Sequence, residues 1–292
     1  MASTHSSSPL VSVLIVAYNA GDYIIQTLDS VLAQSYSNIE VLILDNNSSD
    51  HTRDIIERYQ RSDSRVQLKI SSSNTGPYGW LNHLLLQARW KYIAIQDHDD
   101  IWHPDKLKYQ VEFLENNQKY LGCGTQTMMY YEHDKTYFNY LLEQENYYTI
   151  HPSLMFRHTK DFRYDEELMY FADAYSQKYY LCEWQKKIYN IDKTLTCHII
   201  KSGYSNATYS WFSLNMKHIG RIFDVHGYSF YAILVLNYEI FRKFLMMFQK
   251  HLSNQALFIY FDRLPYRLSG NQILPLSDIK DAYVQKIKDS FL

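Results

Sequence analysis

Residues 10–17 read Leu10-Val-Ser-Val-Leu-Ile-Val-Ala17, a nearly unbroken apolar run that is rich in β-branched side chains. A run of this length is typical of a strand buried on both faces of a parallel sheet. After the turn Asn19-Ala20-Gly21, apolar residues recur at helical spacing, at Ile24, Leu28, Val31 and Leu32. The N-terminal stretch therefore predicts a strand followed by an amphipathic helix.

This strand-and-helix unit repeats three more times within the first 120 residues. Further strands are predicted over 39–44, 66–70 and 91–96, and helices follow Ser48-Ser49-Asp50, Pro77 and His103-Pro104-Asp105. The alternation predicts an α/β fold with a mostly parallel central sheet flanked by helices. Beyond residue 120 the pattern predicts strands over 122–131 and 151–156, a helix over 172–184 and two short strands over 188–200.

Composition excludes several classes of protein. Among 292 residues, 46% are hydrophobic and 21% are charged, which excludes a disordered chain. A net charge of −2 gives no reason to expect nucleic acid as a partner. Three cysteines without metal-type spacing favour a reduced, cytoplasmic protein, and no apolar stretch approaches the length of a spanning helix. Tyrosine is abundant, with 28 residues that lie mostly beyond position 100.

Polar residues follow each of the four predicted N-terminal strands. Because ligands of open α/β sheets bind at the carboxyl ends of the strands, these residues are candidates for one site. In order along the chain they are Tyr18-Asn19, Asp45-Asn46-Asn47, Asn74-Thr75-Gly76 and Asp97-His98-Asp99-Asp100.

The segment Asp97-His98-Asp99-Asp100 favours a divalent cation. In an extended chain residues i and i+2 point the same way, so Asp97 and Asp99 face one ligand together. Like charges at this spacing are unfavourable unless a cation lies between them, and carboxylate oxygens suit Mg²⁺ or Mn²⁺, which complete their shells with phosphates. The spacing does not suit a closed zinc site. The sequence also lacks the glycine-rich loops of dinucleotide-binding and P-loop proteins.

Taken in order, these motifs resemble the family 2 glycosyltransferases of the GT-A fold. The resemblance covers residues 10–205 and rests on Val11–Asn19, Asp45–Thr52, Asn74–Gly76 with Asn82, and Asp97–Leu107. The tail Ile-Trp-His-Pro-Asp-Lys-Leu of the last motif is similar to bacterial rhamnosyltransferase-like members.

The resemblance implies roles in binding a nucleoside-diphosphate sugar, linked to UDP or dTDP. The donor-binding residues implied are Ala17, Tyr18, Asn19, Asp45, Asn47, Asn74, Gly76, Asn82, Asp97 and His98. Asp45 would contact the base, Asp97 the ribose or a metal-bound water, and Asp99 would ligate the metal.

The resemblance also implies inverting transfer, in which a carboxylate takes the proton of the acceptor hydroxyl. Asp173 is the predicted base, with Glu166 and Asp165 as fallback candidates; as an alternative, Asp173 caps a helix. Secondary site candidates are His151 on the acceptor side, Trp102 as a sugar-stacking ring, and His198 or Lys201 near the diphosphate. The alternatives are a structural role for His151, packing for Trp102, as is more frequent for large aromatic residues, and a solvated strand end at His198 and Lys201. Asn47 stands where the family often has glycine, and Ala172 where it often has glutamate.

We therefore expect a flexible segment over 1–9, a catalytic domain over 10–205 with donor half 10–105 and acceptor half 106–205, and a helical C-terminal region over 206–292. Residues 217–292 hold ten Lys and Arg against six Asp and Glu, and the helix expected over 228–252 is aromatic and basic. Such a helix can lie on the inner face of an anionic membrane, or pack on the catalytic domain or a partner subunit.

The predicted function is metal-dependent, inverting sugar transfer to a glycan or lipid-linked acceptor in bacterial surface polysaccharide synthesis. The alternatives are a catalytically inactive nucleotide-sugar or glycan-binding domain, and a nucleotidyltransferase. The latter would need a more basic, glycine-rich loop than Ala20-Gly21-Asp22.

Overall fold

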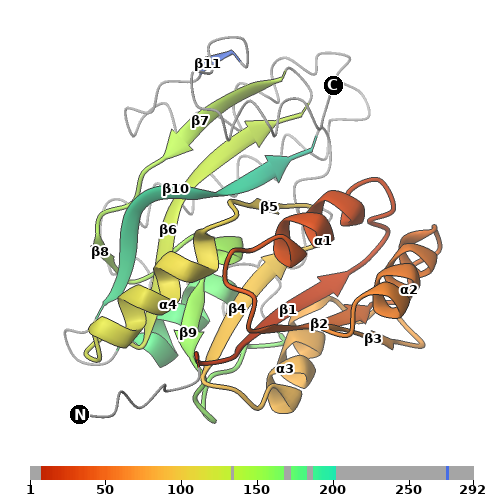
Figure 1. The fold of residues 1–292 in the computed structure, drawn as a ribbon, viewed down its shortest axis with the longest axis horizontal. Coiled ribbons are helices and arrows are strands. Elements are labelled where there is room, and N and C mark those ends of the chain that lie inside the picture. The colour runs from red at the N-terminus through yellow and green to blue at the C-terminus, as the bar shows by residue number, and fades with distance from the viewer. Residues whose placement is uncertain (1–7, 133–134, 168–171, 183–186, 202–273, 276–292) are drawn as a thin grey trace, which may run out of the picture.

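The N-terminal strands form a parallel half-sheet, as predicted. We describe a computed structural model for residues 8–132, 135–167, 172–182, 187–201 and 274–275. In it β1 (Val11–Ala17) lies between β2 (Ile39–Asp45) and β4 (Tyr92–Asp97), and β3 (Val66–Ile70) is the outer strand. All three pairings are parallel, and the predicted α/β fold is confirmed (Figure 1).

The other half of the sheet is mixed rather than parallel. β9 (Met155–Arg157) pairs antiparallel with both β4 and β6 (Gly122–Tyr131), and β7 (Thr136–Tyr140) continues the sheet from β6. Because the connection between β6 and β7 is short, the two strands run antiparallel. Four more strands complete the sheet: β5 (Ile101–Trp102), β8 (Glu145–Asn146), β10 (Ile188–Ile200) and β11 (Leu274–Pro275).

Helices cover both faces of the parallel half. On one face lie α1 (Ile24–Leu32), α2 (Thr52–Ser62) and α4 (Lys106–Asn116). On the other lies α3 (Pro77–Gln87), as Figure 1 shows. Further along the chain come a 3-10 turn, η1 (His151–Ser153), the short helix α5 (Ala172–Ser176) and a π-helical turn, η2 (Gln177–Leu181).

Alternate residues of β1 divide the core into two layers. Val13 and Ile15 belong to the cluster under α1, α2 and α4. Leu14 and Val16 belong to the cluster under α3, which also takes in Tyr164 from the acceptor half. Because successive side chains of a strand point to opposite faces, one apolar run supplies both layers.

Two elements differ from the prediction. Residues 151–153 form η1 rather than the start of a strand, and β9 begins at Met155. Residues 188–200 form one strand, β10, in place of two short strands. Its pairing with β6 shifts register between Ile191 and Thr196, so one bulged strand gave the sequence pattern of two.

The predicted flexible segment 1–9 is described only from residue 8. Of the predicted helical region 206–292, including 228–252, all but residues 274–275 lies outside the described residues. Among the described residues, no helix has the length and hydrophobicity needed to cross a membrane.

Candidate active site

The carboxyl ends of β1, β2 and β4 bring the predicted site residues to one edge of the sheet. In the parallel register Ala17 lies beside Asp45, and Val16 lies beside Asp97. Since neighbouring strands are about 4.8 Å apart, Asp45 and Asp97 flank the end of β1 at a separation of roughly 10 Å. Ala17 is buried at this edge, whereas Tyr18, next along the chain, is 42% exposed.

Asparagines shape the loops after β1 and β2. Asn19 has φ +46° and Asn47 has φ +62°. Asparagine tolerates this left-handed conformation better than most residues, which explains how Asn47 can replace a glycine. The Ser49 N–H donates to Asn19 Oδ1 at 2.9 Å, and the Asn19 N–H donates to Ser48 Oγ at 3.0 Å. These hydrogen bonds tie the two loops together.

Asp45 is buried, and only one of its two carboxylate oxygens accepts a hydrogen bond from the described residues. Its Oδ2 accepts a hydrogen bond from the Ser48 N–H at 3.3 Å. Its Oδ1 is buried and has no hydrogen-bond partner among the described residues. A buried carboxylate oxygen without a donor is costly, so the geometry favours a ligand that offers an N–H group there.

The loop before α3 is organised by Asn74. Its Oδ1 accepts from the Gly76 N–H at 3.0 Å and from Asn46 Nδ2 at 2.9 Å. Gly76 has φ +87°, a conformation that favours glycine, and Pro77 follows it at the start of the helix. This loop therefore reaches the end of β2 through a side-chain hydrogen bond.

Asn82, one turn into α3, holds a distant segment in place. Its Oδ1 accepts from the Tyr164 N–H at 2.8 Å. Its Nδ2 donates to the Tyr164 carbonyl and to Glu166 Oε1, each at 2.9 Å. Both ends of the amide are thus engaged in anchoring residues 164–166, which is a structural role.

Asp100 is fully buried and bonded to β10. His198 Nδ1 donates to Asp100 Oδ2 at 2.8 Å, and the Ile199 N–H donates to Oδ1 at 2.8 Å. Burial raises the pKa of Asp100 to about 6 although His198 opposes it. Burial alone would lower the pKa of His198, but the charge of Asp100 raises it to about 9. Near pH 7 the two side chains therefore form an ion pair.

Asp97 faces a histidine from the acceptor half. His151 lies in η1, and its Nδ1 is 3.1 Å from Asp97 Oδ1, while its Nε2 is 3.0 Å from the Tyr164 hydroxyl. Burial alone would raise the pKa of Asp97, but His151 brings it below its ordinary value. Sequence reasoning missed Tyr164, because nothing in its local sequence points to His151.

Asp99 forms an ion pair with Lys201, the residue that directly follows β10. Lys201 Nζ lies 2.8 Å from Asp99 Oδ2 and 3.8 Å from the centroid of the Tyr23 ring. His98 Nε2 is 4.0 Å from the same carboxylate. Burial alone would raise the pKa of Asp99, but His98 and Lys201 lower it. Asp99, predicted as the metal ligand, is therefore engaged by a cationic side chain.

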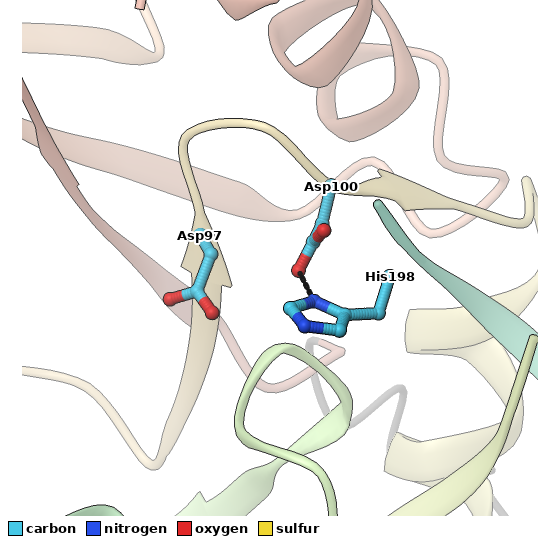
Figure 2. Close-up of side chains that lie close together, drawn as sticks. All are labelled: Asp97, Asp100 and His198. Atoms are coloured by element: carbon cyan, nitrogen blue, oxygen red, sulfur yellow. Dashed lines mark hydrogen bonds and ion pairs between the residues drawn. The ribbon is translucent and has the colours of Figure 1, made fainter. Parts of the chain in front are cut away.

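The structure groups different side chains as potential metal ligands. Asp97, Asp100 and His198 each offer one ligand atom, and these atoms lie within 4.8 Å of one another. Figure 2 shows His198 bonded to Asp100 through one ring nitrogen, with the Asp97 carboxylate beside this pair. The two carboxylates suit Mg²⁺ or Mn²⁺, and the imidazole favours Mn²⁺ of the two, because Mg²⁺ prefers oxygen ligands. The sequence contained the acids, but the pairing of Asp100 with His198 comes from the fold.

The remaining candidates lie at the acceptor side or in the core. Asp173 is in the first turn of α5. Burial raises the pKa of Tyr164, and the charges of Asp173 and Asp97 raise it further, so Asp173 is within electrostatic reach of this group. Trp102 is 1% exposed, donates to the Pro152 carbonyl at 2.7 Å and lies under the Lys106 ammonium. The prediction that Trp102 stacks on a sugar is therefore wrong, because its ring is enclosed.

Two similar proteins are both named as glycosyltransferases. The chain is 43% identical over 106 residues to a protein named for teichuronic acid biosynthesis, the glycosyltransferase TuaG of Bacillus subtilis, covering 36% of this chain and 42% of TuaG. It is 39% identical over 113 residues to the Escherichia coli UDP-Glc:alpha-D-GlcNAc-diphosphoundecaprenol beta-1,3-glucosyltransferase WfaP, covering 39% and 44%. The chain thus spans less than half the length of these curated relatives.

Solved structures share the fold at low sequence identity. Staphylococcus aureus TarS in complex with UDP-GlcNAc is similar at a TM-score of 0.58 and 19% identity, over 80% of this chain and 72% of TarS. The mannosyltransferase PcManGT of Pyrobaculum calidifontis, with GDP-Man and Mn²⁺, is similar at 0.53 and 14%, over 75% and 64%. The model of the family described as "Glycosyl transferase family 2" matches residues 12–179, more than half of the chain. The chain therefore belongs to glycosyl transferase family 2.

Proposed function

We propose that this glycosyltransferase moves a sugar, with inversion, from a nucleoside diphosphate to a hydroxyl of a glycan or lipid-linked acceptor. One observation carries the proposal: the acidic group of Asp97, Asp100 and His198 lies at the same sheet edge as the unsatisfied Asp45 oxygen. A nucleoside diphosphate has an N–H-bearing base at one end and a metal-binding diphosphate at the other. Its chemistry matches both features.

The relatives support this donor and acceptor class. TarS is solved with UDP-GlcNAc and PcManGT with GDP-Man and Mn²⁺. The name of WfaP gives a UDP-linked donor and a diphosphoundecaprenol-linked acceptor, and the name of TuaG gives polysaccharide biosynthesis. For this chain we propose a UDP- or dTDP-linked donor. A lipid-linked acceptor would place the enzyme at the inner face of the membrane, with 228–252 as the contacting segment.

The side chains present fit a divalent cation. Asp97 would hold Mg²⁺ or Mn²⁺ together with Nε2 of His198, once the imidazolium has released its Nε2 proton. Asp100 would orient His198 by occupying its Nδ1, as outer carboxylates do for metal-binding histidines. Asp99 would join them only after its ion pair with Lys201 opens. The cation, when bound, would stabilise negative charge on the departing diphosphate.

The chain's own residues would handle the proton and the leaving group. Asp173 would accept the proton of the acceptor hydroxyl as its oxygen bonds to the anomeric carbon and the bond to the diphosphate breaks. Lys201, freed from Asp99, would offer a positive charge to the diphosphate. The hydrogen bonds from Tyr164 to His151 and from His151 to Asp97 would keep the donor-side carboxylate oriented.

Thermal unfolding with nucleoside diphosphates tests the donor site. We expect UDP or dTDP with Mn²⁺ to raise the melting temperature of the wild-type chain, since a ligand of the native state stabilises it. Asp45→Ala should weaken nucleotide binding about tenfold or more, whereas Asp173→Asn should retain it and lose transfer from a panel of sugar nucleotides. No shift with any nucleoside diphosphate would contradict the proposal. Binding without hydrolysis or transfer in the wild type would favour an inactive binding domain.

A further inference from the structure

A hollow of about 420 Å³ lies on the acceptor half, apart from the strand ends. Its walls come from residues 163–167 and from the helical stretch 175–180. Its size is within the range of small-ligand pockets, which typically combine aromatic walls with a few polar groups.

Tyrosine rings form the apolar part of the hollow. The rings of Tyr175 and Tyr179 are stacked, with centroids 5.7 Å apart and planes at 21°. Tyr180 meets Tyr179 edge-on at 4.8 Å, so the three rings pack together as one cluster. Tyr179 is nevertheless 64% exposed. The turn that carries Tyr179 and Tyr180 is π-helical, a rare form that is frequent at functional sites.

An exposed tyrosine such as Tyr179, with one ring face stacked on Tyr175, leaves its other face for a sugar. The face of an aromatic ring carries partial negative charge, and the C–H bonds on one side of a pyranose carry partial positive charge. The two surfaces attract each other while the sugar hydroxyls remain free to bond to the rim. A single exposed ring is ordinary on a protein surface, but a stacked set lining a hollow is not.

The rim of the hollow is acidic. Among the described residues that line it, three are acids, Asp165, Glu166 and Glu167, and one is a cation, Arg163. Glu166 is held in place by Asn82 Nδ2 at 2.9 Å, and the Arg163 guanidinium lies 5.5 Å from the centroid of the Tyr180 ring. Carboxylates accept hydrogen bonds from hydroxyl or ammonium groups and repel other anions. The rim therefore favours neutral or amino sugars over uronic acids and phosphorylated sugars.

Tyr164 connects the hollow to the sheet edge that carries Asp97. It lines the hollow, and its hydroxyl is bonded to His151, which in turn contacts Asp97. The charge of Asp173 raises the pKa of Tyr164, so the proposed base lies near a residue that lines the hollow. A sugar in the hollow would thus lie close to the proposed base.

We propose that this hollow binds the terminal sugar of the acceptor, and that it selects a neutral or amino sugar by stacking on Tyr179 within an acidic rim. The inference rests on the proposed function only in identifying the bound sugar as part of the acceptor. The binding of a simple glycoside does not depend on it.

Saturation-transfer NMR on the full chain tests the inference without turnover. The probes are the methyl glycosides of glucose, glucosamine and glucuronic acid at pH 7. We expect saturation transfer to the first two and at least fivefold weaker binding of the glucuronide. Tyr179→Ala should lose at least tenfold in affinity and Tyr179→Phe should bind like the wild type, because the ring face is retained. Glu167→Gln should reduce the discrimination against the glucuronide.

Tyr147→Ala is the matched control, since Tyr147 is 42% exposed and lies outside the hollow. Unchanged binding in Tyr179→Ala would overturn the inference, provided that UDP still shifts its melting temperature and so reports a folded chain. Equal binding of the glucuronide would overturn it too, as would no saturation transfer from the wild type to any probe. If glycosides bind as expected but no nucleoside diphosphate does, the hollow stands and the proposed function fails.

Discussion

Lys106 is a charged side chain enclosed in the core. It is fully buried, its Nζ donates to Gln110 Oε1 at 2.8 Å, and it lies 3.9 Å from the centroid of the Trp102 ring. Neither partner carries a charge that could balance an ammonium group. Burial accordingly lowers the pKa of Lys106 to about 7. The unfolded chain, with an ordinary lysine, binds the proton up to a pH of about 10.4.

This difference predicts how stability depends on pH. Between about pH 7 and pH 10 the unfolded chain binds more protons than the folded chain, so Lys106 makes the free energy of unfolding rise with pH. Below pH 7 its full cost applies. Lys106→Met should remove this dependence, and at pH 6 it should stabilise the chain by roughly 1–4 kcal/mol.

Urea unfolding of both proteins from pH 6 to 10 measures the effect. Other titrating groups cancel in the comparison, so the difference between the two curves isolates Lys106. The exposed Lys108, two positions along the same helix, supplies Lys108→Met as the control, which should run parallel to the wild type. Parallel curves for Lys106→Met as well would show that the ammonium is not destabilised by burial.

At the residue scale, sequence predicted residue types better than partners. The acids after β4 and the left-handed turn at Asn47 could be anticipated from local chemistry. The pairing of Asp100 with His198 could not, because 98 positions separate them. The burial of Trp102 could not be predicted either, because its position in a motif does not indicate that its ring is enclosed.

At the element scale, Gly124 of β6 allows another segment to cross the strand closely. A Cβ atom at this position would overlap the Thr149 side chain and lie 2.6 Å from Asn190 Oδ1. Thr149 cannot move away easily, because it is buried and its N–H donates to Gln177 Oε1 at 2.8 Å. The contact joins β6, β10 and the turn before η1.

Gly124→Ala should therefore destabilise the chain by roughly 3 kcal/mol or more, the upper range for overpacking. Gly122→Ala in the same strand is the control. Its Cβ would lie 3.2 Å from Leu181 Cδ1, a side-chain methyl that can shift, so its cost should be below about 1.5 kcal/mol. The midpoints of urea unfolding report both values, and equal losses would contradict the explanation by steric overlap.

The elements of the parallel half were predictable and those of the acceptor half were less so. β1, β2 and β4 are buried on both faces, and β3 is bounded by turn residues. Both features produce a local signal in the sequence. The register shift in β10 and the 3-10 turn at His151–Ser153 follow from contacts with β6 and β4, and distant contacts leave no local pattern.

At the scale of the whole molecule, the site depends on the joining of the two halves. Asp97 comes from the parallel half, while His151 and Tyr164 come from the acceptor half. Asn82 of α3 fixes residues 164–166 against the donor side through three hydrogen bonds. Sequence predicted two halves, but the contacts at their junction are a tertiary property. A probe that reports opening of the sheet therefore tests how tightly the site is held.

The three free cysteines provide that probe. Cys123 in β6 and Cys197 in β10 are fully buried, and burial raises the pKa of Cys123 to about 12 and that of Cys197 well above its ordinary value. Cys182 is partly exposed, and burial raises its pKa to about 11. Because the thiolate is the reactive species, we expect a disulfide reagent at pH 8 to label native Cys123 and Cys197 only through opening of the sheet.

In a Cys182→Ala chain, both remaining thiols should be labelled more slowly than in the urea-unfolded chain. The ratio of the two rates should equal the equilibrium constant for opening of the sheet. UDP at 100 times its dissociation constant should slow it about a further hundredfold, if the opening that exposes the thiols also dismantles the donor site. Cys123 and Cys197 lie in the acceptor-half strands, whereas Asp45 and Asp97 lie in the parallel half. Slowing by UDP would therefore show that the two halves open together. Labelling that is slow without UDP and unchanged by bound UDP would instead show that the acceptor half opens alone, and would contradict a site built on their junction.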